Sequence, residues 1–157
     1  MCIRDSTYAV KGLQSGQIQF LYAPTHLNPT YEYGVTFERG TAVTYGDRKQ
    51  IFISGTASID NQGEIMYPGD ILKQTERMLE NIATLLQEAG GGLQDIMQAI
   101  VYLRDPADYV VVKQYIESRY PSFLHLIVHA PVCRPGWLIE TECIAVIPAD
   151  APQYACL

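Results

Sequence analysis

The C-terminal part of the chain alternates in a way typical of a β-strand. Over residues 138–147, Glu140 and Glu142 fall on one face, because successive side chains of a strand point to opposite faces. The apolar residues on that face are Leu138, Ile144 and Val146. A carboxylate on an apolar strand is unfavourable unless it pairs with a cation, is protonated or has a functional role. Two interpretations stay open. Both glutamates lie at a solvated strand end or pair with arginines, or one is kept protonated as an acid by burial and a nearby like charge.

Alternating residues also predict strands over 17–23, 34–45 and 50–59. The last two form a hairpin around Gly46 and Asp47. The small residues S-G-T-A-S at 54–58 either let a ligand or backbone approach closely or form a bulge at a sheet edge. Residues 23–34 contain two prolines and, counting His26, three aromatic side chains, which favours an ordered loop.

From Ile71 the apolar positions recur in steps of three and four, which predicts a helix with Asp70 as its N-cap and Gly90 at its end. Its polar face is interpreted as solvated; that face comprises Lys73, Gln74, Arg77, Glu80 and Asn81. Strands are predicted over 97–103 and 123–128. A second helix over 109–119 follows Asp105 and Pro106, a cap and a first helical residue.

This order of elements predicts an α+β fold with a single mixed β-sheet and two helices packed on one face. The other face of the sheet carries apolar residues and has no helix to cover it. We therefore expect it to be buried by another subunit.

Composition narrows the classes of function. The chain has 157 residues, a net charge of −6 and no basic cluster, which argues against nucleic-acid binding. No apolar run is long enough to span a membrane and no signal peptide is present, so we expect a cytoplasmic protein. The four cysteines do not have the spacing of metal ligands, and we interpret them as reduced thiols. The three histidines are scattered along the chain, so no metal or cofactor is expected.

Residues 1–6 match nothing that follows and are interpreted as a non-native leader, so we expect the natural chain to begin further upstream. Residues 7–34 would end an upstream region, 35–148 would form the domain, and 149–157 a tail.

Four segments resemble the YjgF/Rid family, whose fold is similar to that of the small chorismate mutases. They are I-F-I-S-G-T-A (51–57), the helix with Gln74-Thr75 and Asn81-Ile82, V-Y-L-R-D (101–105) and I-E-T-E-C-I-A-V (139–146). The resemblance implies a trimer with sites between subunits. Imine and enamine deaminases of this family carry a carboxylate-binding arginine near the penultimate strand. That position falls on or near His125 here, and no arginine lies between Arg119 and Arg134.

The segments P-V-C-R-P-G-W-L-I-E (131–140), F-E-R-G (37–40) and S-G-T-A-S-I (54–59) further resemble the C-terminal domain of chorismatases, also known as pteridine-dependent deoxygenases. This resemblance implies cleavage of the enolpyruvyl ether of chorismate to pyruvate and either a hydroxybenzoate or a dihydroxycyclohexadienoate. Glu140 matches the glutamate that would protonate the ether's methylene carbon. Cys133 resembles the hydroxybenzoate-forming type and Ala57 the diol-forming type, so the product stays open.

Carboxylates of a substrate are best held by arginine, because its guanidinium forms bidentate pairs. The candidates are Arg39, with an exposed hairpin charge or a pair with Glu38 as alternatives, and Arg134; Arg104 is a further possibility. Tyr31 either donates a hydroxyl or packs in the core. Two alternative functions remain: a Rid-type imine or enamine deaminase, and a non-enzymatic trimer that binds a small carboxylate.

Overall fold

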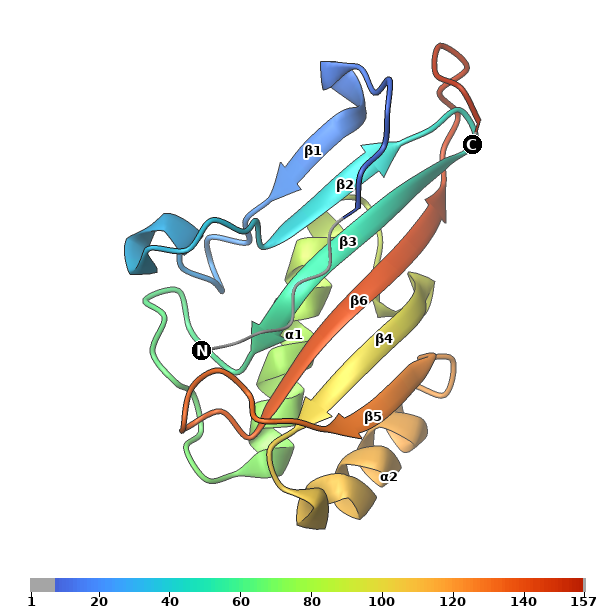
Figure 1. Ribbon diagram of the computed structural model, residues 1–157. Coiled ribbons are helices and arrows are strands. Elements are labelled where there is room, and N and C mark those ends of the chain that lie inside the picture. Colours follow the sequence, from blue (N-terminus) through green and yellow to red (C-terminus); the bar gives the residue numbers. More distant parts are fainter. Residues whose placement is uncertain (1–7, 157) are drawn as a thin grey trace.

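The computed structural model describes residues 8–156, so the predicted leader at 1–6 lies outside the described residues. Six strands form one sheet in the order β1-β2-β3-β6-β4-β5 (Figure 1). The bounds are β1 Ile18–Leu21, β2 Gly40–Thr44, β3 Arg48–Ala57, β4 Ile96–Leu103, β5 His125–His129 and β6 Ile139–Pro148. β4 and β5 run parallel and the other neighbours antiparallel, which makes the sheet mixed.

Two α-helices, α1 (Ile71–Glu88) and α2 (Tyr109–Arg119), lie on one face of this sheet (Figure 1), as predicted for the α+β fold. Short 3₁₀ turns join the elements: η1 Ser15–Gln17, η2 Thr30–Tyr33, η3 Leu93–Asp95 and η4 Pro106–Asp108. The second helix is preceded by the predicted cap, because the Asp105 side chain accepts a hydrogen bond from the Ala107 amide and Pro106 begins η4.

Two strands begin later than predicted. The hairpin does turn at Gly46 and Asp47, but β2 starts at Gly40 rather than at residue 34, because its neighbour β1 ends at Leu21, opposite Gly40. β5 starts at His125 rather than at residue 123, because the amide of Phe123 closes a turn onto the carbonyl of Tyr120.

The helix α1 follows its local signals closely. The Asp70 carboxylate accepts a hydrogen bond from the Lys73 amide (3.0 Å), and the helix ends just before Gly90, whose φ is +88°. The prediction of a solvated polar face is wrong for Gln74 and Asn81, which are fully buried. Both keep hydrogen-bond partners: the Asn81 amide group, for example, donates to backbone carbonyls at the end of β3.

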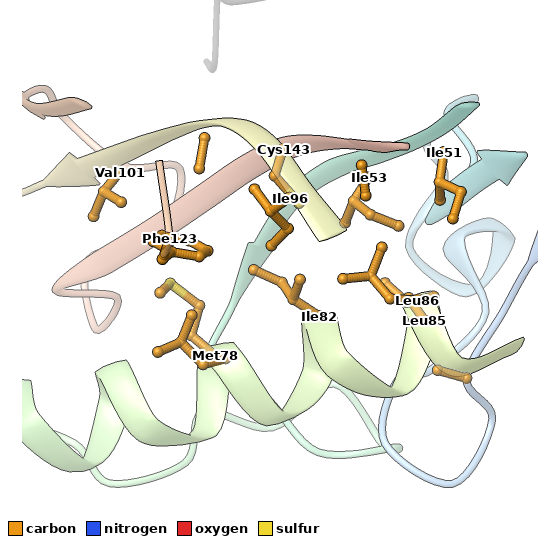
Figure 2. Close-up of a cluster of buried hydrophobic side chains, with 14 of the residues drawn as sticks. Ile51, Ile53, Met78, Ile82, Leu85, Leu86, Ile96, Val101, Phe123 and Cys143 are labelled. Atoms are coloured by element: carbon orange, nitrogen blue, oxygen red, sulfur yellow. The ribbon is translucent and has the colours of Figure 1, made fainter. Parts of the chain in front are cut away.

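The hydrophobic core fills the layer between α1 and the sheet (Figure 2). Met78, Ile82, Leu85 and Leu86 of α1 face apolar side chains of β3, β4 and β6. Among the strand residues are Ile51, Ile53, Ile96, Val101 and Cys143. Each fully buried Leu or Ile contributes about 1.5–3 kcal/mol. The spacing read from the sequence therefore indicates the buried stripe correctly.

The opposite face of the sheet has no helix among the described residues. In the strand register, Leu126 of β5 is paired with Ile100 of β4. Phe20 of β1 is paired with Thr41 of β2, which is in turn paired with Phe52 of β3, so these side chains share one face. Leu126 is 62% exposed and Phe20 49% exposed, so large apolar side chains on this face reach solvent in the single chain. This helix-free face carries the side chains of Glu140 and Glu142.

Candidate functional site

Glu140 lies on β6, a central strand of the sheet, close to the point where residues 130–138 enter this strand. In the ladders of β6 it lies opposite Ala57 of β3 and Tyr102 of β4. Although it is on the helix-free face, the residue is only 7% exposed. Glu142, two residues along β6, is opposite Ile100 and half-buried. The interpretation of both glutamates as solvated strand-end residues is therefore wrong for Glu140.

The carboxyl group of Glu140 rests against the backbone of Gly55. A Cβ atom added to Gly55 would collide with Oε1 of Glu140 and lie 3.2 Å from its Cδ. The register of β3 against β6 shifts between Ile53 and Thr56, which is a bulge. The small-residue segment thus contains a bulge, and the group that approaches it closely is the side chain of Glu140 rather than a backbone segment. The bulge lies in an interior strand, however, and not at a sheet edge as one interpretation had it.

Cys133 and Arg134 lie in the turn between β5 and β6, residues 130–138, which we call the β5–β6 turn. Cys133 is exposed, and the guanidinium of Arg134 lies 5.4 Å from the ring centroid of Trp137. The turn leads directly into Glu140, so chain connectivity brings three of the candidate residues to one end of the sheet.

Arg39 is buried, with 4% of its surface exposed, so the interpretation as an exposed hairpin charge is wrong. Its guanidinium donates to the carbonyl oxygen (3.0 Å) and the side-chain oxygen (2.9 Å) of Asn28. Arg39 thereby anchors the loop that contains Asn28. Tyr31, in the same loop, is 77% exposed, so its alternative role in core packing is also wrong.

A polar pocket of about 250 Å³ connects this loop with the β5–β6 turn. Its lining residues are Asn28, Glu32, Gln62, Gly63, Glu64 and Arg134. Asn28 therefore contacts Arg39 and also lines the same pocket as Arg134. A second, mainly apolar pocket of about 300 Å³ lies beyond the end of β4, lined by Leu103, Pro106, Tyr109, Ile127, Val128 and His129.

His125 begins β5, with Nδ1 2.8 Å from the carbonyl oxygen of Phe123. This distance fits an Nδ1–H donor, because a carbonyl oxygen can only accept. Along β5, from His125 to His129, no arginine is present.

Two residues that position the site, Gly55 and Gln74, have no individual role predicted from the sequence, and Arg104 is predicted only as a further candidate for binding a substrate carboxylate. Gln74 and Arg104 donate side-chain hydrogen bonds to carbonyls of the β5–β6 turn. One signal in the sequence could have identified these three residues. Each lies in a segment that resembles the YjgF/Rid family: S-G-T at 54–56, the helix with Gln74, and R-D at 104–105.

Among residues 8–156 no group of three His, Cys, Asp or Glu residues could hold a metal ion. Cys143 faces the core, where burial raises the pKa of its thiol to about 12, so it is unreactive near neutral pH. None of the helices in the described part of the chain has the length and apolar character needed to cross a membrane.

Comparison with known protein sequences identifies one family for this chain. Residues 40–147 match the family described as Endoribonuclease L-PSP. The 3-aminoacrylate deaminase RutC of Acinetobacter baylyi is 31% identical over 97 residues, which cover 60% of this chain and 77% of that protein. A RutC family protein of Pyrococcus abyssi is 35% identical over 97 residues, covering 60% and 76%.

Solved structures share the fold at lower identity. RidA from Psychrobacter sp. PAMC 21119 superimposes with a TM-score of 0.67 at 24% identity, covering 82% of this chain and 99% of the other. TdcF of E. coli, solved with bound serine, gives a TM-score of 0.66 at 21% identity over 82% and 98%. Yeast Mmf1 gives a TM-score of 0.70 at 14% identity over 82% and 98%.

Proposed function

Because this chain belongs to the Endoribonuclease L-PSP family, which includes the YjgF, Rid and RutC proteins, we propose that it is a hydrolase that protonates an electron-rich carbon–carbon double bond. The substrate is a small carboxylate that contains an enamine or an enol ether, and Glu140 is the acid. The observation that carries this proposal is the buried carboxyl group of Glu140 against the backbone of Gly55, on the helix-free face. The net charge of −6 disfavours RNA as the substrate.

The two substrate types need the same first step. A carboxylic acid that is held away from water keeps its proton more readily and can deliver it to carbon. An enamine protonated at carbon becomes an iminium ion. Water adds to that ion, a proton is lost, and ammonia leaves to give a carbonyl compound. An enol ether protonated at its methylene carbon becomes an oxocarbenium ion, and the addition of water releases a ketone and an alcohol.

Similarity to the 3-aminoacrylate deaminase RutC supports an enamine as the substrate. This chain departs from the deaminase pattern described above in having His125 near the position of the carboxylate-binding arginine. In this proposal Arg134, at the polar pocket, takes that role. Its guanidinium can bind a carboxylate in a bidentate manner.

Chorismate is the second candidate substrate, and the composition of the β5–β6 turn favours it. Cys133 and Arg134 precede Glu140 as they do in the chorismatase pattern. Protonation by Glu140 would turn the enolpyruvyl group into an oxocarbenium ion. Addition of water to this cation and loss of a proton would give a hemiketal, which separates into pyruvate and a dihydroxycyclohexadienoate. Alternatively, the neighbouring ring hydroxyl would attack the ring carbon of the cation that bears the ether, so that the ring carbon–oxygen bond breaks, pyruvate leaves, and the epoxide that forms isomerises to a hydroxybenzoate with loss and regain of a proton. Ala57, opposite Glu140 in the ladder, would border the ring and affect which nucleophile reaches the cation.

We further propose that the helix-free face is covered by other copies of the chain in a homotrimer. The support is the exposure of Leu126 and Phe20 on a face where Glu140 and Glu142 also lie. Exposed apolar area of this kind is typical of an interface. A second copy over this face would complete the enclosure of the site.

The proposal is tested by measuring two products with the same protein. Ammonia release is followed with 3-aminoacrylate formed in situ, and pyruvate release with chorismate. We expect one substrate to be turned over, and Glu140→Gln to abolish the reaction without loss of fold. Glu142→Gln is the matched control, because it makes the same substitution on the same face of the same strand, two residues away. Wild-type turnover that persists in Glu140→Gln, or no turnover of either substrate, would refute the proposal.

A further inference from the structure

The β5–β6 turn receives its shape from two side chains outside it. The turn contains Pro131 and Pro135, which have no amide hydrogen to donate to regular structure. Within the turn, the amide of Trp137 closes onto the carbonyl of Arg134 (3.0 Å). Several carbonyls of the turn accept hydrogen bonds from Arg104, directly after β4, and from Gln74 of α1. In Figure 1 the turn, in orange-red, extends from the end of the sheet at which α1 begins.

Arg104, directly after β4, gathers three carbonyls of the turn on one guanidinium. Its Nε donates to Trp137 O (2.7 Å), and one terminal nitrogen donates to Val132 O (2.9 Å) and Arg134 O (2.6 Å). The Arg104 amide also donates to Leu138 O (3.0 Å). Hydrogen bonds from a charged donor are the stronger class, and the planar fork of arginine fixes the direction of each. Lysine could not hold the same three carbonyls in one plane.

Gln74 holds the other side of the turn from α1. Its side-chain amide donates to Gly136 O (3.0 Å) and Tyr67 O (3.2 Å), while its Oε1 accepts from the Leu138 amide (2.9 Å). The residue is fully buried. Since both ends of the amide are used, a carboxylate of the same size would lose both donated bonds.

Glu140 does not depend on these contacts in the same way. It is held by strand ladders on both sides, opposite Ala57 and Tyr102. The site thus has two separately supported parts. One part is the acid on the sheet, and the other is the turn that carries Arg134 and Cys133.

We propose that Arg104 and Gln74 are positioning residues that set the substrate affinity of the site by fixing the β5–β6 turn, while leaving the protonation step to Glu140. This inference rests on the proposed function. It predicts that loosening the turn raises KM and leaves kcat nearly unchanged. A residue with a merely structural role would instead reduce the amount of active protein, and so lower the apparent kcat at constant KM.

The test uses Arg104→Lys and Gln74→Glu in the full chain. We expect KM to rise about tenfold or more in each, the factor that corresponds to the loss of one hydrogen bond from a charged donor in Arg104→Lys and of the two donated hydrogen bonds in Gln74→Glu. Arg77→Lys is the matched control. Arg77 is also a half-buried arginine that donates to backbone carbonyls, those of Ile59 and His26, but it makes none of these contacts with the turn.

Trp137 gives a second readout that does not require turnover, because it is the single tryptophan of the chain and lies in the turn. We expect its emission to be quenched more readily by acrylamide in Arg104→Lys and Gln74→Glu than in wild type or Arg77→Lys. Unchanged quenching in both variants would overturn the proposal, and so would an unchanged KM in an active enzyme. Failure of the proposed function is recognised separately, because wild type itself would then release neither product.

Discussion

Gly55 offers a way to displace the carboxyl group of Glu140, the proposed acid, without disturbing the fold. In Gly55→Ala the new Cβ would overlap Oε1 of Glu140 and approach Cδ to 3.2 Å, whereas ordinary contacts begin at 3.4 Å. The carboxyl must therefore move by about 1 Å, a displacement that can cost about 100-fold in rate. That factor corresponds to about 2.7 kcal/mol in the barrier.

Although Gly55→Ala should slow the reaction, it should leave the free energy of unfolding unchanged or raise it slightly. Gly55 is within a strand and is not among the described glycines with positive φ, so alanine can adopt its conformation. Glycine in a strand interior is less favourable than alanine by about 0.5–1 kcal/mol, which offsets the strain of moving a side chain. We expect kcat to fall about 100-fold while the melting temperature stays within a few degrees of wild type.

The assay measures initial rates over a range of substrate concentrations, with circular dichroism and thermal melts on the same samples. Gly92→Ala is the matched control, because Gly92 has an extended backbone and its added Cβ would meet only the flexible end of Gln94. Two results would contradict the reasoning: a kcat within threefold of wild type, or a loss of folded protein in step with the loss of rate.

Three further predictions concern stability, the buried thiol and assembly. Ile82→Ala, in the centre of the core, should lower the free energy of unfolding by about 2–5 kcal/mol in urea titrations, and a value below 1 kcal/mol would contradict the packing described above. Burial raises the pKa of the Cys143 thiol in the folded protein to about 12, above its ordinary value of 9.0. The neutral thiol therefore contributes fully to the free energy of unfolding below pH 9, and this contribution is lost as the pH rises from 9 towards 12. Urea titrations at pH 8 and pH 10 should show this fall, and Cys143→Ala should reduce it; an equal fall in both proteins would exclude Cys143 as its cause. Leu126→Arg should convert the proposed trimer to a folded monomer in sedimentation velocity experiments, and an unchanged sedimentation coefficient would count against the helix-free face as the interface.

Local signals were sufficient for the elements and for their order. The extent of α1 could be predicted because Asp70, the apolar spacing and Gly90 all act within a few residues of the helix itself. The two carboxylates on one face of β6 could be predicted for a similar reason, since the alternation of a strand depends only on the backbone. Strand ends were less certain, because β2 begins where its partner β1 ends, and pairing is not a local property.

The roles of the polar residues could not be predicted in this way. Gln74 looks like a solvated helix residue, but its partners Gly136 and Leu138 lie more than sixty residues away in the chain. Arg39 looks like a hairpin charge, but Asn28 reaches it from a separate loop. For both residues, burial is acceptable only because distant backbone or amide groups satisfy their hydrogen bonds.

The sequence by itself determined the secondary structure, the buried stripe of α1, the class of fold and the presence of a carboxylate pair on an apolar strand, because each depends on residues close together in the chain. Only the tertiary structure decided that Glu140 is enclosed while Glu142 is half-exposed, since the difference arises from the bulge that brings Gly55 against one carboxyl. It also decided that Arg104, from the sequence a possible carboxylate-binding residue, supports the β5–β6 turn, because three carbonyls converge on its guanidinium only after β4, β5 and β6 have paired.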